Sequence, residues 1–155
     1  MNCQFLCSSH ASQLAQHLEA TAPIWSSWMR KGNDARQAPN LELSLQYFGC
    51  AYDLAVLLVE RFTAHAELDG QRHGERLLQA GRCLTEVLAV CGHLALRREY
   101  LNRIRLLLYR EQLRMPLLAD RLPQIDDSLA SMLDAYSGSL RQRDHCATTA
   151  RRSLN

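Results

Sequence analysis

The chain has 155 residues, a formal net charge of +2, and 28 Leu and 18 Ala against 4 Val and 3 Ile. Leu and Ala lose little conformational freedom in a helix, whereas β-branched residues favour sheets, so the composition predicts an all-α protein. The charge comes from 17 Arg and one Lys, and so small an excess argues only weakly for a nucleic-acid or membrane binder.

The cysteines and the N-terminal residues bear on the compartment. Cys50, Cys83 and Cys91 lie in apolar helical stretches, where we expect reduced, buried thiols. Residues 1–7 lack the basic region of a secretory signal, and the longest apolar run in a helix, residues 54–59, is far shorter than the ~20 residues of a membrane span. We therefore expect a cytoplasmic protein with no membrane partner.

The first forty residues are predicted to form a helix, a short apolar segment and a loop. A serine pair can cap a helix from Ser8 to about Ala20, which Pro23 should close. The apolar segment at residues 24–29 carries two tryptophans on one face and should dock on the core. Residues 32–40 have loop composition and are expected to be a mobile connection.

The strongest predicted helix spans residues 41–66 and is capped by Asn40. Apolar residues cover most of its circumference, which is typical of a central helix surrounded by other helices. One narrow polar strip remains on it, and this strip consists of Gln46, Asp53 and Glu60. Residues 68–71 should then turn the chain before a second helix that starts near His73.

The rest of the chain predicts further helices. We place a turn at residues 92–97, a helix at residues 98–113 and another at residues 123–138. Arg, Ser and Thr dominate residues 139–155, which form a C-terminal tail. Residues 1–138 are therefore predicted to be a single all-α domain, a compact antiparallel bundle or a short α-α repeat array of five to seven helices.

Two segments carry a pattern of helical repeats. Residues 45–52, Leu-Gln-Tyr-Phe-Gly-Cys-Ala-Tyr, fit the first helix of a tetratricopeptide repeat, in which a glycine allows two helices to pack closely. Thirty-two residues later the same places hold Leu77, Ala80, Gly81 and Leu84. Residues 41–114 therefore resemble a tetratricopeptide-repeat protein, although the family period is about 34 residues and the second copy lacks the aromatic residue. The same residues also fit an antiparallel bundle in which Gly49 and Gly81 meet neighbouring helix backbones.

The resemblance implies a scaffold that holds a peptide or a partner helix in a concave groove. It implies that four residues of the first helices face this groove, namely Gln46, Asp53, Arg82 and Glu86. Small bacterial secretion chaperones use this architecture at a similar length, an analogy for which the chain has no specific motif. A protein or peptide partner is thus expected, and a homodimer is compatible with the sequence.

No constellation typical of catalysis is visible. Cys3, Cys7 and His10 could meet one metal ion on a helical N-terminus, but the fourth ligand of a zinc site is missing. Cys83 and Cys91 lie on or beside an apolar face, where a thiol is inert, and the sequence has no glycine-rich phosphate loop. We therefore expect a protein that is not an enzyme and that holds no metal and no cofactor.

Arginines dominate residues 97–114. Three of them, Arg103, Arg110 and Arg114, lie near one face of the predicted helix. They could form a basic ridge that contacts phosphates, or a solvated face whose stems cover apolar surface and whose heads pair with acids on neighbouring helices.

The sequence thus favours a non-catalytic helical protein-interaction module with a regulatory, adaptor or chaperone role. Two alternatives remain: a basic protein that binds nucleic acid through the arginine helix, and a helical bundle that binds a small ligand or acts as an enzyme through residues that no linear motif reveals.

Overall fold

The computed structural model describes residues 5–17, 21–61 and 67–111, together with Pro123, Asp127 and Ala130. This part of the chain contains five α-helices and no strand, which confirms the all-α class. The helices are α1 (Ser8–Gln16), α2 (Thr21–Gln37), α3 (Leu41–Arg61), α4 (Glu67–Val90) and α5 (Leu94–Glu111). Most of the predicted helix at residues 123–138, and the whole tail at 139–155, lie outside the described residues.

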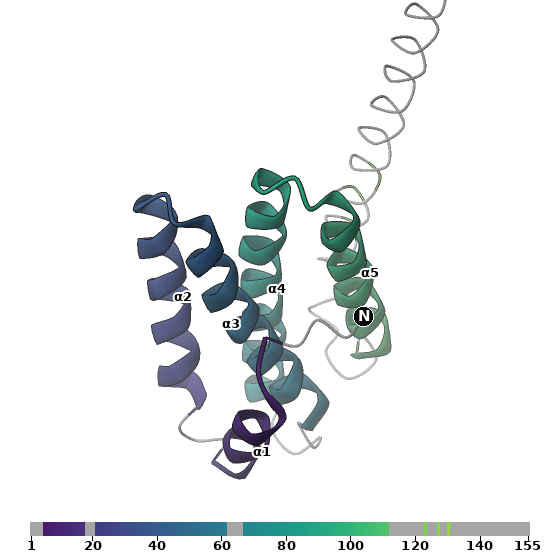
Figure 1. The fold of residues 1–155 in the computed structure, drawn as a ribbon. Helices are drawn as coiled ribbons and strands as arrows, with labels where there is room; N and C mark the ends of the chain where they lie inside the picture. The colour runs from purple at the N-terminus through teal and green to yellow at the C-terminus, as the bar shows by residue number, and fades with distance from the viewer. Residues whose placement is uncertain are drawn as a thin grey trace, which may run out of the picture.

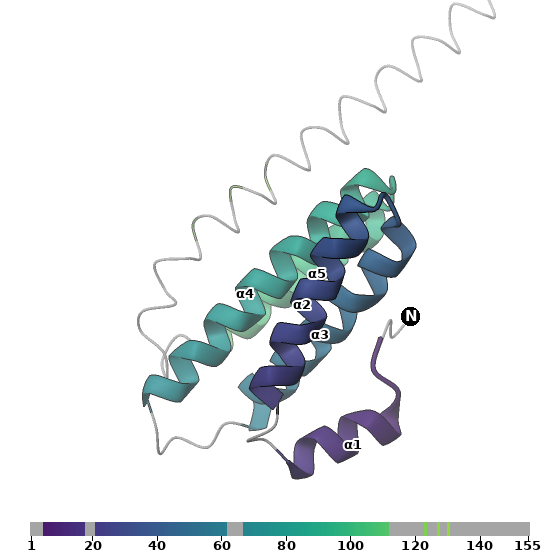
Figure 2. The same ribbon diagram turned by 90° about the vertical axis from the view of Figure 1, so that its left-hand side faces the viewer.

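The four long helices run antiparallel, side by side (Figure 1). Each packs mainly against its neighbours in the chain, so that α3 lies between α2 and α4, and α5 packs on α4. The short α1 packs mainly against α3 and lies beside one end of the long helices (Figure 2). Three helices therefore contact α3, which confirms its predicted central position.

Helix α3 begins and packs as its sequence predicts. The Asn40 side chain caps it, because its Oδ1 accepts a hydrogen bond from the Leu43 N–H at 3.1 Å. Phe48, Leu54 and Ala55 are completely buried. Among the described residues, Leu41–Glu60 is the one stretch that is long and apolar enough to cross a membrane by length and composition. A core helix covered by its neighbours acquires the same composition.

The predicted loop at residues 32–40 is wrong, because α2 runs through most of it and only residues 38–40 connect α2 to α3. Contacts with α3 account for the difference. A Cβ atom on Gly32 would lie 2.6 Å from Phe48 Cε1, so the glycine lets the phenyl ring pack directly against α2. The Ser44 hydroxyl also donates a hydrogen bond to the Gly32 carbonyl oxygen at 2.9 Å. Tertiary packing therefore holds as a helix a segment whose composition indicates a loop.

Two other predicted breaks lie inside helices. Pro23 does not close a helix but belongs to the first turn of α2, where a missing N–H removes no helical hydrogen bond. Helix α4 begins at Glu67, so the turn predicted at residues 68–71 is wrong. A glycine within a helix costs only about 1 kcal/mol relative to alanine, and Gly70 therefore does not end α4 by itself.

The connection between α4 and α5 is shorter than the predicted turn at residues 92–97. Gly92 adopts a left-handed conformation with φ of 75°. The Gly92 N–H donates to the Ala89 carbonyl at 3.0 Å, and the His93 N–H donates to the Leu88 carbonyl at 2.8 Å. This pair of bonds is the Schellman motif, which ends a helix at glycine. Helix α5 starts immediately afterwards, at Leu94.

Gly49 and Gly81 both lie at crowded positions, but the neighbours are side chains and not helix backbones. A Cβ atom on Gly81 of α4 would collide with the end of the Ile104 side chain of α5. A Cβ atom on Gly49 of α3 would collide with the ring of Phe5, which precedes α1. The predicted collision with a helix backbone is therefore wrong at both positions.

Candidate functional site

A cavity of about 560 Å³ opens between α3 and α5, next to the start of α1. We call it the α3–α5 groove. Its apolar walls consist of Leu6, Ala11, Val56, Leu57, Leu106 and Leu107. Leu106 is 69% exposed, although it points to a cavity lined mainly by apolar side chains. A concave apolar site of this size with a few polar groups is typical of ligand and peptide sites.

The polar lining of the groove comes from Tyr52, Asp53, Glu60 and Arg103. The structure thus brings together three of the residues predicted from sequence, Asp53, Glu60 and Arg103. Tyr52 is only 2% exposed, and its hydroxyl has no hydrogen-bond partner among the described residues. Burial raises the pKa of this hydroxyl well above its ordinary value, so it stays protonated and able to donate. An unpaired buried hydroxyl costs free energy, which a bound ligand would recover.

The Asp53 carboxylate binds the N-terminal segment of the chain itself. Its Oδ2 accepts hydrogen bonds from the backbone N–H groups of Phe5 at 2.6 Å and Leu6 at 3.0 Å. Burial raises the pKa of Asp53, while these two N–H groups and the Arg103 guanidinium act in the opposite direction. The Phe5 ring packs at Gly49, and the Leu6 side chain is buried.

Two arginines of the predicted ridge, Arg103 and Arg110, make contacts within the bundle. Arg110 makes an ion pair with Glu60 of α3, with Nη2 and Oε1 3.7 Å apart. The Arg103 guanidinium lies over the Tyr100 ring, 5.8 Å from its centroid, and lines the groove. Arg114 lies outside the described residues. In the described part of α5, Arg103 therefore covers an aromatic ring and Arg110 pairs with an acid of α3.

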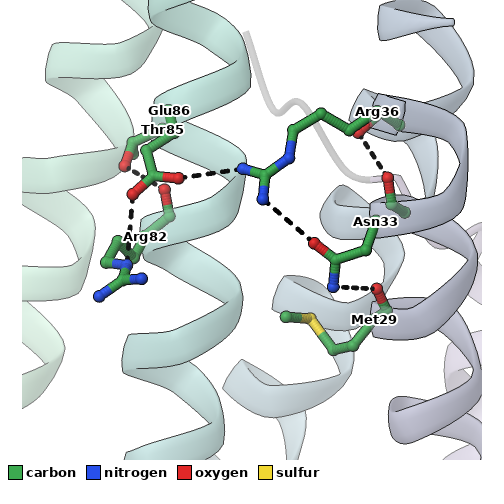
Figure 3. A network of polar contacts seen from close by, with 8 residues as sticks. Met29, Asn33, Arg36, Arg82, Thr85 and Glu86 are labelled. Carbon is green, nitrogen blue, oxygen red and sulfur yellow. Dashed lines mark hydrogen bonds and ion pairs between the residues drawn. The ribbon is translucent and has the colours of Figure 1, made fainter. Parts of the chain in front are cut away.

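Two other predicted site residues lie away from the groove, where α2 faces α4 (Figure 3). Glu86 pairs with Arg36 of α2 at 3.2 Å and with Arg82 of its own helix at 3.2 Å. We call these three residues the α2–α4 clasp. Arg36 also donates to the side-chain oxygen of Asn33 at 3.3 Å. Gln46, the remaining predicted residue, is exposed on α3 and is not part of the groove lining.

The cysteines are free where they are described. Cys83 is buried as expected, whereas Cys50 and Cys91 are only partly buried. The Sγ atom of the exposed Cys7 lies 3.2 Å from the Ser9 hydroxyl and 3.2 Å from His10 Nδ1. Hydrogen bonds from Ser9 and His10 lower the pKa of the Cys7 thiol to about 7. Cys3 lies outside the described residues, and among those described no three potential ligands cluster as a metal site.

Sequence reasoning missed the buried hydroxyl and the apolar walls of the groove. Tyr52 belongs to the repeat pattern, in which aromatic residues are expected to serve packing only. The run Leu106-Leu107-Leu108 could have indicated the apolar walls. Three consecutive leucines cannot all lie on the one face of α5 that packs against α4.

In comparisons with protein-family models, with curated proteins and with solved structures, nothing matches this chain.

Proposed function

We propose that this protein is a non-catalytic helical interaction module with a regulatory, adaptor or chaperone role, and that it binds a segment of a partner protein in the α3–α5 groove. The main support is the combination of apolar walls, of which Leu106 is the most exposed, with a buried hydroxyl that has no partner among the described residues. A partner side chain or backbone group that accepts a hydrogen bond from Tyr52 would satisfy it.

The tetratricopeptide-like character of residues 41–114 is part of this proposal. In that reading, α3 and the helices around it form the concave scaffold. Asp53 and Glu60 then contribute to the partner surface, whereas Glu86 pairs with Arg36 of α2 and with Arg82, away from the groove.

A pair of matched variants tests the proposal. Leu106 and Val90 are similarly exposed, at 69% and 71%, but only Leu106 lines the groove. We expect Leu106→Asp to lose the partner that the wild type captures from an extract of the native cell, and Val90→Asp to retain it. Circular dichroism checks that both variants keep their helices. Retention of the partner by both variants, or loss by both, would contradict the proposal.

A small-ligand site is the second candidate function. The cavity volume lies in the range typical of small-molecule sites, and the Tyr52 hydroxyl could fix the orientation of a ligand. Native mass spectrometry of protein purified from its own cell distinguishes the two candidates. A retained small molecule, which a Leu106→Asp variant lacks, would favour the second.

A further inference from the structure

The N-terminal segment lies at one end of the α3–α5 groove, where Leu6 is part of the wall, and is held against α3 in the manner of a bound peptide. Its backbone donates two consecutive N–H groups to Asp53 Oδ2, and its Phe5 carbonyl oxygen accepts a hydrogen bond from the Cys50 thiol, with Sγ and O 3.8 Å apart. The Phe5 ring fills the space left by the absent side chain of Gly49, with its centroid 6.3 Å from that of Tyr100. Leu6 is 7% exposed. Backbone bonds combined with two side-chain contacts are a recurring mode of peptide recognition.

The rest of this N-terminal region is loosely attached. None of the described side chains of α1 is buried. The helix packs mainly against α3 and makes no extensive contact with α2, α4 or α5 (Figure 2). Release of residues 5–6 would therefore disturb little of the hydrophobic core, whose buried members, apart from Leu6, belong to the long helices.

We propose that Phe5 and Leu6 are an internal occupant of the surface formed by Gly49, Asp53 and Tyr100 at one end of the groove, and that a partner segment of the same chemistry replaces them. That segment is extended and carries an aromatic residue followed by an aliphatic one. Its two consecutive backbone N–H groups bind Asp53, and its aromatic ring packs at Gly49. This inference rests on the proposed function and specifies the kind of partner that the groove takes.

The adjoining cavity explains how a partner can win this competition. A tethered segment has an effective concentration on the order of millimolar, so a free peptide that makes only the same contacts competes poorly. The internal segment leaves the space between Leu57, Leu106 and Leu107 empty. A longer partner segment that fills this space gains apolar burial, and also reaches Tyr52 and Arg103.

The test uses the full chain and a fluorescent peptide with the sequence of residues 1–10, in which both cysteines are replaced (Cys3→Ser, Cys7→Ser). We expect the double variant Phe5→Ala/Leu6→Ala to bind this peptide at least tenfold more tightly than the wild type. The reason is that the variant lacks the two side chains that compete with the peptide for the site. A Ser12→Ala/Gln13→Ala variant, changed at exposed positions of α1, is the matched control and should bind like the wild type. Equal affinity for all three chains would overturn the inference.

The role of Asp53 is tested in the Phe5→Ala/Leu6→Ala double variant. Asp53→Ala should weaken peptide binding at least fivefold, since two backbone N–H groups lose their acceptor, whereas Asp53→Asn keeps one acceptor oxygen and should weaken it less. If Asp53→Ala binds as well as its parent, the assigned recognition is wrong.

A measurement on the unaltered chain does not depend on the folding of any variant. Excess unlabelled peptide should accelerate hydrogen exchange at the chain's own Phe5 and Leu6 amides, observed by NMR, because their bonds to Asp53 open. Unchanged exchange at saturating peptide would overturn the inference.

Two further outcomes separate this inference from other occupants and from the proposed function. If the wild type is a dimer and the Phe5→Ala/Leu6→Ala variant is a monomer, the inference is overturned. The N-terminal segment would then be exchanged between two copies of the chain. If Leu106→Asp abolishes partner capture while the peptide never displaces residues 5–6, partners bind beside the segment, and the proposed function stands without this inference.

Discussion

The α2–α4 clasp and the α3–α5 groove place polar side chains between long helices, but the surroundings of these side chains differ. In the clasp, Glu86 pairs with Arg36 and Arg82, and all three side chains remain substantially exposed. In the groove, the Tyr52 hydroxyl is buried without a partner among the described residues. An exposed ion pair contributes little and requires nothing more, whereas a buried unpaired group costs free energy until a ligand satisfies it. Burial and pairing, more than residue type, therefore distinguish a fold contact from a candidate binding site.

The largest expected effect is a difference in melting temperature between two glycine substitutions, one inside the bundle and one beside the groove. Gly81→Leu forces a side chain against Ile104 between α4 and α5, and overpacking of this kind costs about 1–3 kcal/mol. The melting temperature should therefore fall by several degrees. At Gly49→Leu the nearest obstacle is the Phe5 ring, which can leave with its segment, so that the gain of about 1 kcal/mol in helix propensity, common to both substitutions, offsets more of the cost. Its melting temperature should change much less, and a larger fall than for Gly81→Leu would contradict the comparison.

Removal of one hydroxyl from each region should change stability in opposite directions. Tyr52→Phe deletes the unpaired hydroxyl and should raise the free energy of unfolding by up to about 1 kcal/mol. Thr85→Val, next to the clasp, deletes a hydroxyl that donates to the Arg82 carbonyl at 3.0 Å and should lower the free energy of unfolding by about 1 kcal/mol. Urea unfolding measures both. A loss of stability in Tyr52→Phe would mean that the hydroxyl is already satisfied.

The smallest expected effect is a change in the free energy of unfolding with pH, caused by the shifted pKa of Asp53. Its pKa is raised in the folded protein, mainly by burial, so the folded state binds more protons than the unfolded state above the ordinary value of 3.8. The stability that this group contributes is therefore greatest at or below that ordinary value and decreases as pH rises through the folded-state pKa. Between pH 4 and pH 7, the wild type should lose stability relative to Asp53→Asn. A relative gain would indicate that its bonds to Phe5 and Leu6 outweigh its burial.

The helices follow from local chemistry and could be predicted. Leucine and alanine favour helices wherever they fall, Asn40 caps α3 with its own side chain, and Gly92 supplies the left-handed residue that ends α4. Each of these effects involves residues within a few positions of one another. The same reasoning failed at residues 32–37, because Phe48 and Ser44 of α3 hold that segment helical.

The candidate site could be predicted only in part. The polar strip of α3 and the arginines of α5 identified Asp53, Glu60 and Arg103, since a polar residue on an apolar helix is visible in the periodicity. The periodicity cannot say which helix faces that residue. Arg82 and Glu86 were assigned to the same surface, but Glu86 pairs with Arg36 of α2 and with Arg82 of its own helix.

The sequence by itself therefore determined the fold class, the central helix and the side chains available for recognition, because these depend on composition and short-range spacing. Only the tertiary structure decided that the Tyr52 hydroxyl is buried with no partner in the described part of the chain, that Asp53 binds the backbone of Phe5 and Leu6, and that Leu106 lines a cavity. Those properties depend on contacts between residues about fifty positions apart, and such contacts are set by how the helices pack.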